Sequence, residues 1–382
     1  MALPSFRFTS LIIIAALALT ACADGCGGDE AAEEQERAPR PDVTFLQFGT
    51  YHFCTLDDLN QVWCAGSNAR GQLGDGSDDD RDELTRVTGI GEMSGLAVGL
   101  FDTTCAWNEG GDLFCWGSNE FGVLASEDLD QSSTPVRIDG LPPVKDVTLG
   151  GFHACAVTDD DEAYCWGRND KGQIGVGGRQ GDVIHTPQQV TIPGGVHQIQ
   201  VGGAHSCAVN QTGELFCWGT NAEGQLGIAL DAVAAVTLPE PVVFLPGAVV
   251  DLKVAFRHTC ILVGERRRLY CWGDNSQGQF GLDDLEPRFE PVEIADIAYA
   301  DELAVAAGQT CARIDDQVYC AGEVLRPVEV ARETGEGYFF RPSQALQHTE
   351  QMWSGGLAIC GLADEAALAC RGVQPGGGTP MP

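Results

Sequence analysis

Fourteen of the sixteen cysteines fall into seven pairs, and this pattern limits the possible folds more than any other feature of the sequence. The two members of a pair lie 9 to 11 residues apart, and the first member recurs every 49 to 53 residues. Self-similarity at such a period is typical of propellers and solenoids, in which each repeat forms one supersecondary unit. The pairs are Cys54 with Cys64, Cys105 with Cys115, Cys155 with Cys165, Cys207 with Cys217, Cys260 with Cys271, Cys311 with Cys320, and Cys360 with Cys370.

Each pair lies on a predicted β-hairpin. In the third unit, strands are expected on either side of Asp159–Asp161, which has turn composition, and Cys155 and Cys165 stand symmetrically about it. Directly opposed cysteines on antiparallel strands lie within disulfide range. The commonest zinc pattern needs ligands two to four residues apart, which these pairs do not offer. We therefore expect seven disulfides and no metal site.

The hairpin is followed by Trp-Gly-x-Asn-x-x-Gly-Gln-Leu/Ile-Gly, seen at Trp166–Gly175, at Trp218–Gly227 and, with Phe before the last Gly, at Trp272–Gly281. With the preceding His-x-Cys and the later Pro-Val strand starts, residues 43–371 closely resemble the regulator of chromosome condensation repeat family. The resemblance implies an all-β, seven-bladed β-propeller of tandem repeats with four strands per blade around a central channel. Strand alternation should press the aromatic face of one blade against the disulfide face of the next.

Several units depart from the pattern. The first has Cys64-Ala-Gly66, the second loses the Gln and the last Gly, and the sixth lacks Asn-x-x-Gly-Gln altogether. The seventh unit ends at Gly372 and runs into Gln-Pro-Gly-Gly-Gly, without a fourth strand. Either residues 36–42 supply that strand or the blade has three strands.

The amino terminus predicts export. An apolar run from Leu11 to Leu19 follows Arg7, as in a signal peptide, and is too short for a permanent transmembrane helix. Leu19-Thr20-Ala21-Cys22 resembles the lipobox of bacterial lipoproteins, which implies cleavage after residue 21 and acylation of Cys22; an ordinary secretory signal is the alternative. Residues 22–42, which contain the unpaired Cys26, then form an acidic flexible tether, and residues 372–382 a flexible tail.

These features predict a lipoprotein of a bacterial cell envelope, in the outer membrane or on the cell surface. The chain has 55 acidic and 22 basic residues, a formal net charge of −33. A surface that acidic repels the phosphates of nucleic acid and anionic lipid headgroups. We therefore expect no nucleic-acid partner, and contact with a membrane only through the lipid anchor.

Four histidines recur two residues before the first cysteine of their units: His52, His153, His205 and His258. Equivalent positions on different blades lie far apart, so a packing or hydrogen-bonding role is expected. The Asp-rich stretches 78–80, 159–161 and 283–284 lack the EF-hand spacing. No motif of a serine hydrolase, a phosphate-binding loop or a zinc protease is present. We expect no catalytic residue and no cofactor.

The sequence thus favours a non-catalytic, monomeric propeller that binds a protein or another macromolecule. The relatives implied by the resemblance use loop faces for binding. A hydrolase or lyase that acts on an envelope or extracellular substrate is the alternative, with a site assembled from loops of different blades. Binding specificity should lie in segments that break the repeat, at Gly177–His185, Ala229–Leu238 and Ala331–Gln351. Within the last, Tyr338, Phe339 and Phe340 are candidate interface anchors, unless they pack over the closing blade.

Overall fold

The computed structural model describes residues 43–178, 183–228, 233–322, 340–343, 346, 349, 351–356, 358–363 and 367–372. The chain divides into two compact units, Met1–Asp42 and Val43–Pro382, and the second contains every described residue. The regular secondary structure of the described residues consists of β-strands alone. The expected all-β class is therefore confirmed.

Six antiparallel sheets have four strands each, in sequence order, and are called blades 1 to 6. Blades 1 to 3 contain β1 (Val43–Phe48), β2 (His52–Asp57), β3 (Val62–Gly66), β4 (Arg81–Arg86); β5 (Gly95–Val98), β6 (Thr103–Trp107), β7 (Leu113–Ser118), β8 (Gln131–Arg137); β9 (Val144–Leu149), β10 (His153–Thr158), β11 (Ala163–Arg168) and β12 (Val183–Val190). Blades 4 to 6 contain β13 (Val196–Val201), β14 (His205–Asn210), β15 (Leu215–Thr220), β16 (Ala235–Pro241); β17 (Val249–Val254), β18 (His258–Val263), β19 (Arg268–Gly273), β20 (Arg288–Glu293); β21 (Glu302–Ala306), β22 (Gln309–Ile314), β23 (Gln317–Gly322) and β24 (Arg341–Pro342).

The last repeat forms a three-stranded sheet, called the closing sheet, with β25 (Met352–Gly355), β26 (Ala358–Ala363) and β27 (Ala367–Gly372). The predicted seven-bladed propeller is therefore wrong in its number of blades: the described residues form six complete blades. The physical reason lies in the sequence after β27, where the three successive glycines 376–378 follow Pro375, and glycine weakens a strand because it has no side chain to pack. Residues 36–42, one of the two alternatives for the fourth strand of this sheet, lie outside the described residues.

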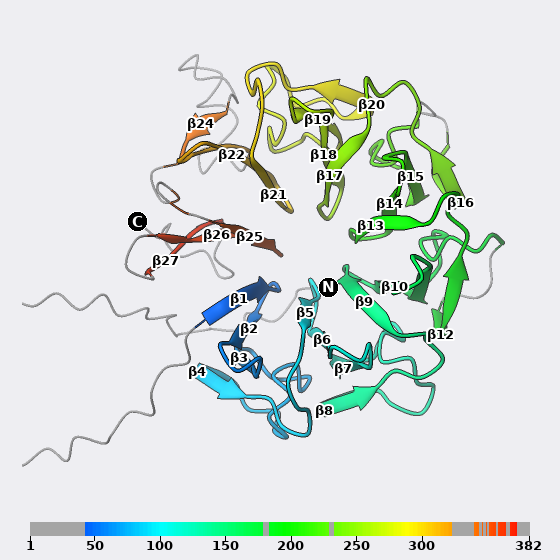
Figure 1. The fold of residues 1–382 in the computed structure, drawn as a ribbon, viewed down its shortest axis with the longest axis vertical. Coiled ribbons are helices and arrows are strands. Elements are labelled where there is room, and N and C mark those ends of the chain that lie inside the picture. The colour runs from blue at the N-terminus through cyan, green and yellow to red at the C-terminus, as the bar shows by residue number, and fades with distance from the viewer. Residues whose placement is uncertain are drawn as a thin grey trace, which may run out of the picture. The chain divides into compact units, whose positions relative to one another are not determined.

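The sheets are arranged in a ring around a central axis, with the first strand of each sheet innermost (Figure 1). β1 contacts both β5 and β25, so the closing sheet completes the ring beside blade 1. A cavity of about 480 Å³ lies between the innermost strands and is lined by residues such as Gln47, Asp146 and Gln200. The ring of sheets and the central channel that the sequence predicted are therefore confirmed.

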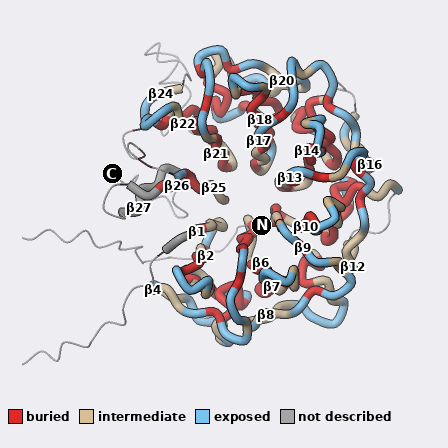
Figure 2. The backbone as a smooth tube through the Cα atoms, in the orientation of Figure 1, coloured by how far each residue is buried: buried red, intermediate tan, exposed pale blue. Residues whose placement is uncertain are grey.

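Burial follows the position of a strand within its blade, as Figure 2 shows for the tube. The second strands β10, β14 and β18 are buried along their whole length, whereas the fourth strands β4 and β8 have no buried residue. The second strand is covered by strands on both edges and by blades on both faces. It therefore consists of apolar residues and of buried polar ones with hydrogen-bond partners, such as His205 and Ser206, while the fourth strand is partly exposed to solvent.

The predicted hairpin register is confirmed, and with it six of the seven expected disulfides. Their Cα atoms lie 4.0 to 4.2 Å apart, and the pairs separated by 11 and by 9 residues keep the same opposition because only their turns change length. The bridges join Cys54 to Cys64, Cys105 to Cys115, Cys155 to Cys165, Cys207 to Cys217, Cys260 to Cys271 and Cys311 to Cys320.

The seventh pair lies in the closing sheet. Cys360 stands opposite Cys370 in the register of β26 and β27. The Cys370 side chain lies outside the described residues, so this bridge stays a prediction.

Contacts between blades are formed by tryptophan. Trp166 of blade 3 lies in one buried cluster with Cys105 and Cys115 of blade 2, and blades 1, 3 and 4 meet the blades that follow them in the same way. The Trp218 indole donates a hydrogen bond to the carbonyl of Gln173 at 2.8 Å. Its ring lies so close to Gly175 that a Cβ there would be 2.6 Å from Nε1. The last glycine of the repeat motif thus leaves room for the tryptophan of the following blade, and blade 2 has the small residue Ala125 at the same place, also with a positive φ.

Candidate binding face at the channel mouth

The antiparallel order of each blade gives the propeller two different faces. The first-to-second strand turns and the third-to-fourth strand loops lie at one end of the strands, which we call the mouth face. It includes the turns Gly49–Tyr51, Gly99–Asp102, Gly150–Phe152, Gly202–Ala204 and Ala255–Arg257. The second-to-third strand turns and the links to the next blade lie at the other end, called the connection face.

Backbone hydrogen bonds join successive turns on the mouth face. The amide of Leu100 donates to the carbonyl of Gly150 at 3.2 Å, and Gly151 donates to Gly202 at 3.0 Å. The next link runs from Gly203 to the Phe256 carbonyl, 3.1 Å away. A Cβ on Gly150 would lie 2.2 Å from the Gly202 oxygen, so glycine is required for this approach. The turns from different blades therefore form one rigid rim around the channel.

Four phenylalanines from three blades gather on this rim. The rings of Phe101 and Phe152 stack with centroids 5.3 Å apart, and Phe121 meets Phe152 edge-on at 4.7 Å. Phe256 approaches Phe101 edge-on at 6.3 Å. All four side chains are partly exposed, so the cluster offers an apolar surface to solvent as well as packing within itself. We call these four residues the mouth cluster.

Arginines lie over the same rings. The Arg168 guanidinium is 5.0 Å from the centroid of Phe152 and 5.7 Å from that of Phe121, and forms an ion pair with Asp170. Arg257 lies 5.7 Å over Phe256, is exposed, and has no ion pair with any residue that the structure describes. A guanidinium within about 6 Å of a ring is attracted by its quadrupole. The mouth face thus combines arginine with aromatic rings in a chain whose net charge is −33.

A small cavity of about 80 Å³ opens beside the mouth cluster, between Phe101, Phe121, Asp102 and Glu120. Asp102 has a positive φ of 41°, and its carboxylate accepts a hydrogen bond from Gln72 at 2.9 Å. Burial raises the pKa of the Asp102 carboxyl, and the charge of Glu120 acts in the same direction. A non-glycine residue with positive φ is strained, and such strain collects at binding sites.

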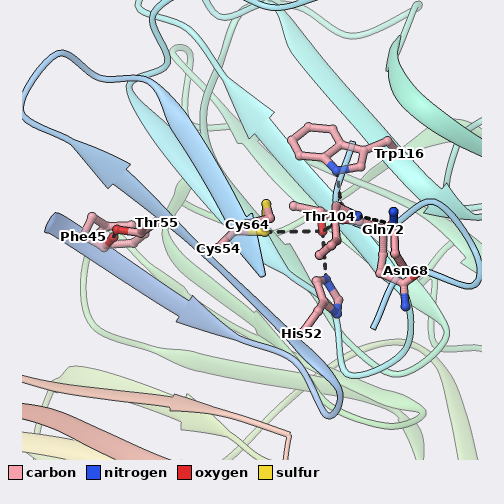
Figure 3. Close-up of a disulfide and its surroundings, with 10 residues drawn as sticks. Phe45, His52, Cys54, Thr55, Cys64, Asn68, Gln72, Thr104 and Trp116 are labelled. Atoms are coloured by element: carbon pink, nitrogen blue, oxygen red, sulfur yellow. Dashed lines mark hydrogen bonds between the residues drawn. A yellow bond between two sulfur atoms is a disulfide. The ribbon is translucent and has the colours of Figure 1, made fainter. Parts of the chain in front are cut away.

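The four repeated histidines have a hydrogen-bonding role between blades, as the sequence predicted. Figure 3 shows His52 with its Nε2 2.9 Å from the hydroxyl of Thr104, which in turn donates to the carbonyl of Gln72. The indole of Trp116 donates to the same carbonyl. Burial lowers the pKa of His52 to about 3. A histidine that is neutral, buried and committed in this way is not available as a general acid or base.

The same contact recurs wherever both partners are present. His153 meets Ser206 at 2.7 Å, His205 meets Thr259 at 3.1 Å, and His258 meets Thr310 at 3.2 Å. Where blade 2 meets blade 3, both partners of this hydrogen bond are replaced together. Thr103 stands at the histidine position, and Ala154 stands at the position of the serine or threonine. The histidines therefore belong to the interfaces between blades.

The candidate lipidation and binding residues from the sequence fall mostly outside the described residues, namely Cys22, Cys26, Tyr338 and Phe339. Phe340 is described, and it packs against a buried cluster of blades 5 and 6, with its ring close to Gly281. Phe340 therefore packs within the propeller, which the sequence had left open as the alternative to a role as an interface anchor. Among the described residues no group of three or more His, Cys, Asp or Glu could hold a metal ion. No helix in this part of the chain is long and apolar enough to cross a membrane.

Sequence reasoning missed the mouth cluster because it searched the segments that break the repeat. Its members lie within the repeat. Phe101, Phe152 and Phe256 are at turn positions where blade 4 carries the small residues Gly203 and Ala204, and Phe121 takes a loop position that holds Lys171 or Glu223 in other units. Aromatic side chains at such turns were the available signal. Whether these rings meet depends on the distances between blades. The spacing of residues along the chain does not give those distances.

Comparison with known proteins agrees with the repeat and the fold. A family model described as "RCC1-like domain" matches residues 22–323. The ultraviolet-B receptor UVR8 of Arabidopsis thaliana is 31% identical over 271 residues, which cover 69% of this chain and 60% of that protein. The probable E3 ubiquitin-protein ligase HERC6 of Homo sapiens is 32% identical over 274 residues, 67% of this chain and 26% of the other.

Among solved structures, Prp20p from Saccharomyces cerevisiae is 18% identical and superposes with a TM-score of 0.69 over 87% of this chain and 82% of that one. The ectodomain of the receptor kinase ACR4 from Arabidopsis thaliana is 19% identical, with a TM-score of 0.53 over 87% and 96%. At these identities the likeness shows the fold alone. The fold and the repeat define a β-propeller of tandem disulfide-linked hairpins. The chain belongs to the RCC1-like domain family.

Proposed function

We propose that this chain is a non-catalytic binding protein whose propeller docks a protein partner through the mouth face. One observation carries the proposal: Phe101, Phe121, Phe152 and Phe256 form a partly exposed cluster with Arg168 stacked on it. Aromatic residues and arginine dominate the energetics of protein interfaces: the rings bury much area with few rotatable bonds, and the guanidinium both stacks on rings and donates hydrogen bonds.

The rigidity of the rim supports the same proposal. The turns that carry Phe101, Phe152 and Phe256 are joined by backbone hydrogen bonds, so their rings are held in place before a partner arrives. A preorganised surface loses less conformational entropy on binding, which leaves more of the contact energy for affinity.

Relatives of this family support a binding role. Prp20p is described by its binding to Gsp1p and to histones, and a second structure shows Kap60 bound to the same yeast protein. The chain spans 60% of the length of the ultraviolet-B receptor and 26% of that of HERC6. The activities named for those whole proteins are therefore not transferred to this chain, and only the use of the propeller as a docking module is.

We further propose that the propeller is displayed outside the cytoplasm, anchored through an acylated Cys22. The support is the sequence Leu19-Thr20-Ala21-Cys22 after a short apolar run. Disulfides in six successive hairpins agree with an oxidising compartment. A protein of the envelope or of the exterior is then the partner.

The test uses the chain without residues 1–22, purified with its disulfides intact, as bait for proteins of the native envelope. A partner that is identified and purified is then titrated with the wild type and with Phe101→Ala/Phe152→Ala. We expect the double variant to lose at least tenfold in affinity, as is usual for interface anchors. The control is Leu59→Ala, an apolar residue on the connection face that is more exposed than either phenylalanine. If the double variant and Leu59→Ala bind the partner with equal affinity, the mouth face is not the binding site.

A further inference from the structure

The link between β16 and β17, on the connection face, exposes a phenylalanine at its tip. The Phe244 side chain is 98% exposed, and its backbone has a φ of 64°. Its neighbour Val243 is 50% exposed. A bulky side chain with positive φ is a genuine outlier, because its Cβ crowds the backbone in the left-handed region.

Equivalent links in blades 1 and 2 place glycine at this position. In each link a buried residue donates its backbone amide to the start of the third strand, as Val87 does to Val62 and Val242 to Leu215. Two residues later come Gly89, with φ 80°, and Gly140, with φ 83°. Phe244 occupies the same place in blade 4, so the three links share a positive φ at this position and differ in its side chain.

The residue after the tip completes the equivalence. Ile90, Leu141 and Leu245 all pack against the buried cluster beneath their links. The link of blade 4 is therefore held as firmly as the others, and the exposure of Phe244 is not caused by a loosely packed loop. Phenylalanine here adds strain in the left-handed region and exposes a ring to water, without contacts within the chain that would compensate. A contact outside the chain would compensate for both costs.

Charges near the tip indicate what kind of surface would accept it. Three exposed glutamates lie on neighbouring parts of the connection face: Glu240 on β16, Glu214 in the adjacent turn of blade 4, and Glu265 in the turn of blade 5. That turn is joined to the link, since the amide of Gly264 donates to the carbonyl of Ala248. Three bases, Arg266, Arg267 and Arg268, follow Glu265, and Arg268 forms an ion pair with Glu293. Among the groups here without an ion pair in the described residues, the three glutamates outnumber Arg266 and Arg267, in a chain of net charge −33.

We propose that Phe244, with Val243, is the anchor of a second docking site on the connection face, and that it takes a protein whose surface has an apolar pocket for a phenyl ring within a basic rim. Opposite charges around a buried aromatic anchor give both orientation and fast association. An anionic lipid surface would instead be repelled by the same glutamates. The site stands apart from the mouth face, and neither proposal depends on the other.

Stability gives the first test. Phe244→Gly restores the residue that blades 1 and 2 use, so it relieves strain without removing an internal contact. Glycine also enlarges the entropy of the unfolded chain, which offsets part of the gain. We expect the melting temperature to stay constant or to rise by about 1–2 °C. A fall of several degrees would show that the ring contributes to folding, and would overturn the proposal.

Photo-crosslinking in the cells that make the protein gives the second test. The full chain carries 4-benzoylphenylalanine at position 244 or, as a control, at Leu59, which is 61% exposed on the connection face of blade 1. We expect a protein adduct at 244 that is absent at 59. Lipid adducts, a second copy of this chain, or no adduct above the control would each overturn the proposal.

The adduct is then identified, and the purified partner is titrated. We expect Phe244→Gly to lose at least tenfold in affinity, while Phe101→Ala/Phe152→Ala binds as the wild type does. Replacing Glu214, Glu240 and Glu265 by Gln should slow association at low salt and weaken its salt dependence. Equal affinity of Phe244→Gly, or loss confined to the mouth-face variant, contradicts a site at Phe244 and leaves the mouth face to be judged separately.

Discussion

The Nε2 atom of His153 lies 2.7 Å from the hydroxyl of Ser206 in the next blade, and that hydroxyl donates onward to the carbonyl of Gln173 at 2.9 Å. A serine hydroxyl has one proton, and here it is given to the carbonyl. The histidine Nε2 must therefore carry the proton and donate it to Ser206. Nδ1 is then unprotonated, and it is buried without a hydrogen-bond partner among the described residues. By the same argument His52, His153 and His205 are neutral Nε2–H tautomers, since Thr104 and Thr259 likewise donate to carbonyls.

This arrangement predicts that acid destabilises the propeller. Burial lowers the pKa of His52, His153 and His205 to about 3 and that of His258 to about 4, whereas an unfolded histidine titrates near 6.5. Between these values the unfolded chain binds more protons, so stability falls as the pH drops below 6.5. At pH 5 each histidine should cost about 2 kcal/mol relative to pH 7.

The measurement is the free energy of unfolding in urea at pH 7 and pH 5, for the wild type and for His205→Gln. Glutamine is a matched replacement, because Gln309 takes the histidine position in blade 6. The variant should show a pH dependence that is shallower by about 2 kcal/mol. Parallel pH profiles for the two proteins would contradict the neutral, buried histidine.

A carboxyl group in the channel should act in the opposite direction. Burial raises the pKa of Asp146 to about 6, despite the nearby charges of Lys253 and Lys145. Because the folded pKa lies above the unfolded value of 3.8, this group stabilises the protein at low pH and loses that effect as the pH rises through about 6. Asp146→Asn should therefore raise the free energy of unfolding at pH 7, by about 1–3 kcal/mol, and change it less at pH 4. Urea titrations at both pH values decide this, and a loss of stability at pH 7 would mean that the charge itself is needed.

The disulfides predict a specific peptide map. Digestion without reduction should recover Cys155 linked to Cys165 and the five counterparts that the structure describes. The register of β26 and β27 predicts a further link between Cys360 and Cys370. Replacing Cys155 and Cys165 together by serine should destabilise the protein by about 2–4 kcal/mol. A link between cysteines of different blades would be incompatible with this register.

Phe340 should behave as a core residue. Its ring packs against Phe280 and its neighbours in blades 5 and 6 and is only partly exposed. Phe340→Ala should therefore lower the free energy of unfolding by about 2 kcal/mol, less than for a fully buried ring. Chemical denaturation measures the effect, with Phe244→Ala as the exposed control. An unchanged midpoint for Phe340→Ala would restore its candidacy as a binding residue.

Acylation of Cys22 is tested by metabolic labelling. Cells fed an alkyne analogue of palmitate should label the wild type but not Cys22→Ser, which also should fail to sediment with membranes. The expectation rests on Leu19-Thr20-Ala21-Cys22. Equal labelling of both proteins would place the lipid elsewhere, and labelling of neither would show that the amino terminus is an ordinary secretory signal.

The hairpins could be predicted from the sequence because their determinants are local. Cys155 and Cys165 are ten residues apart, so a tight turn is enough to set them opposite each other. The Trp-Gly and Asn-x-x-Gly-Gln segments likewise report contacts within one repeat or with the next, and the hydrogen-bonding role of the four histidines followed from their repetition. The same reasoning overcounted the blades, since a seventh cysteine pair requires a seventh hairpin but not a fourth strand.

Tertiary structure alone decided which residues from different blades come together. Phe101, Phe152 and Phe256 meet because ring closure brings three turns, which are between 51 and 155 residues apart in sequence, to one rim. The exposure of Phe244 was equally hidden, because the sequence Val-Val-Phe-Leu suggests a buried strand. Only the backbone of its link shows that the ring points into solvent. Patterns along a chain encode the elements that neighbouring residues form, whereas distances between blades depend on how all the sheets pack around one axis.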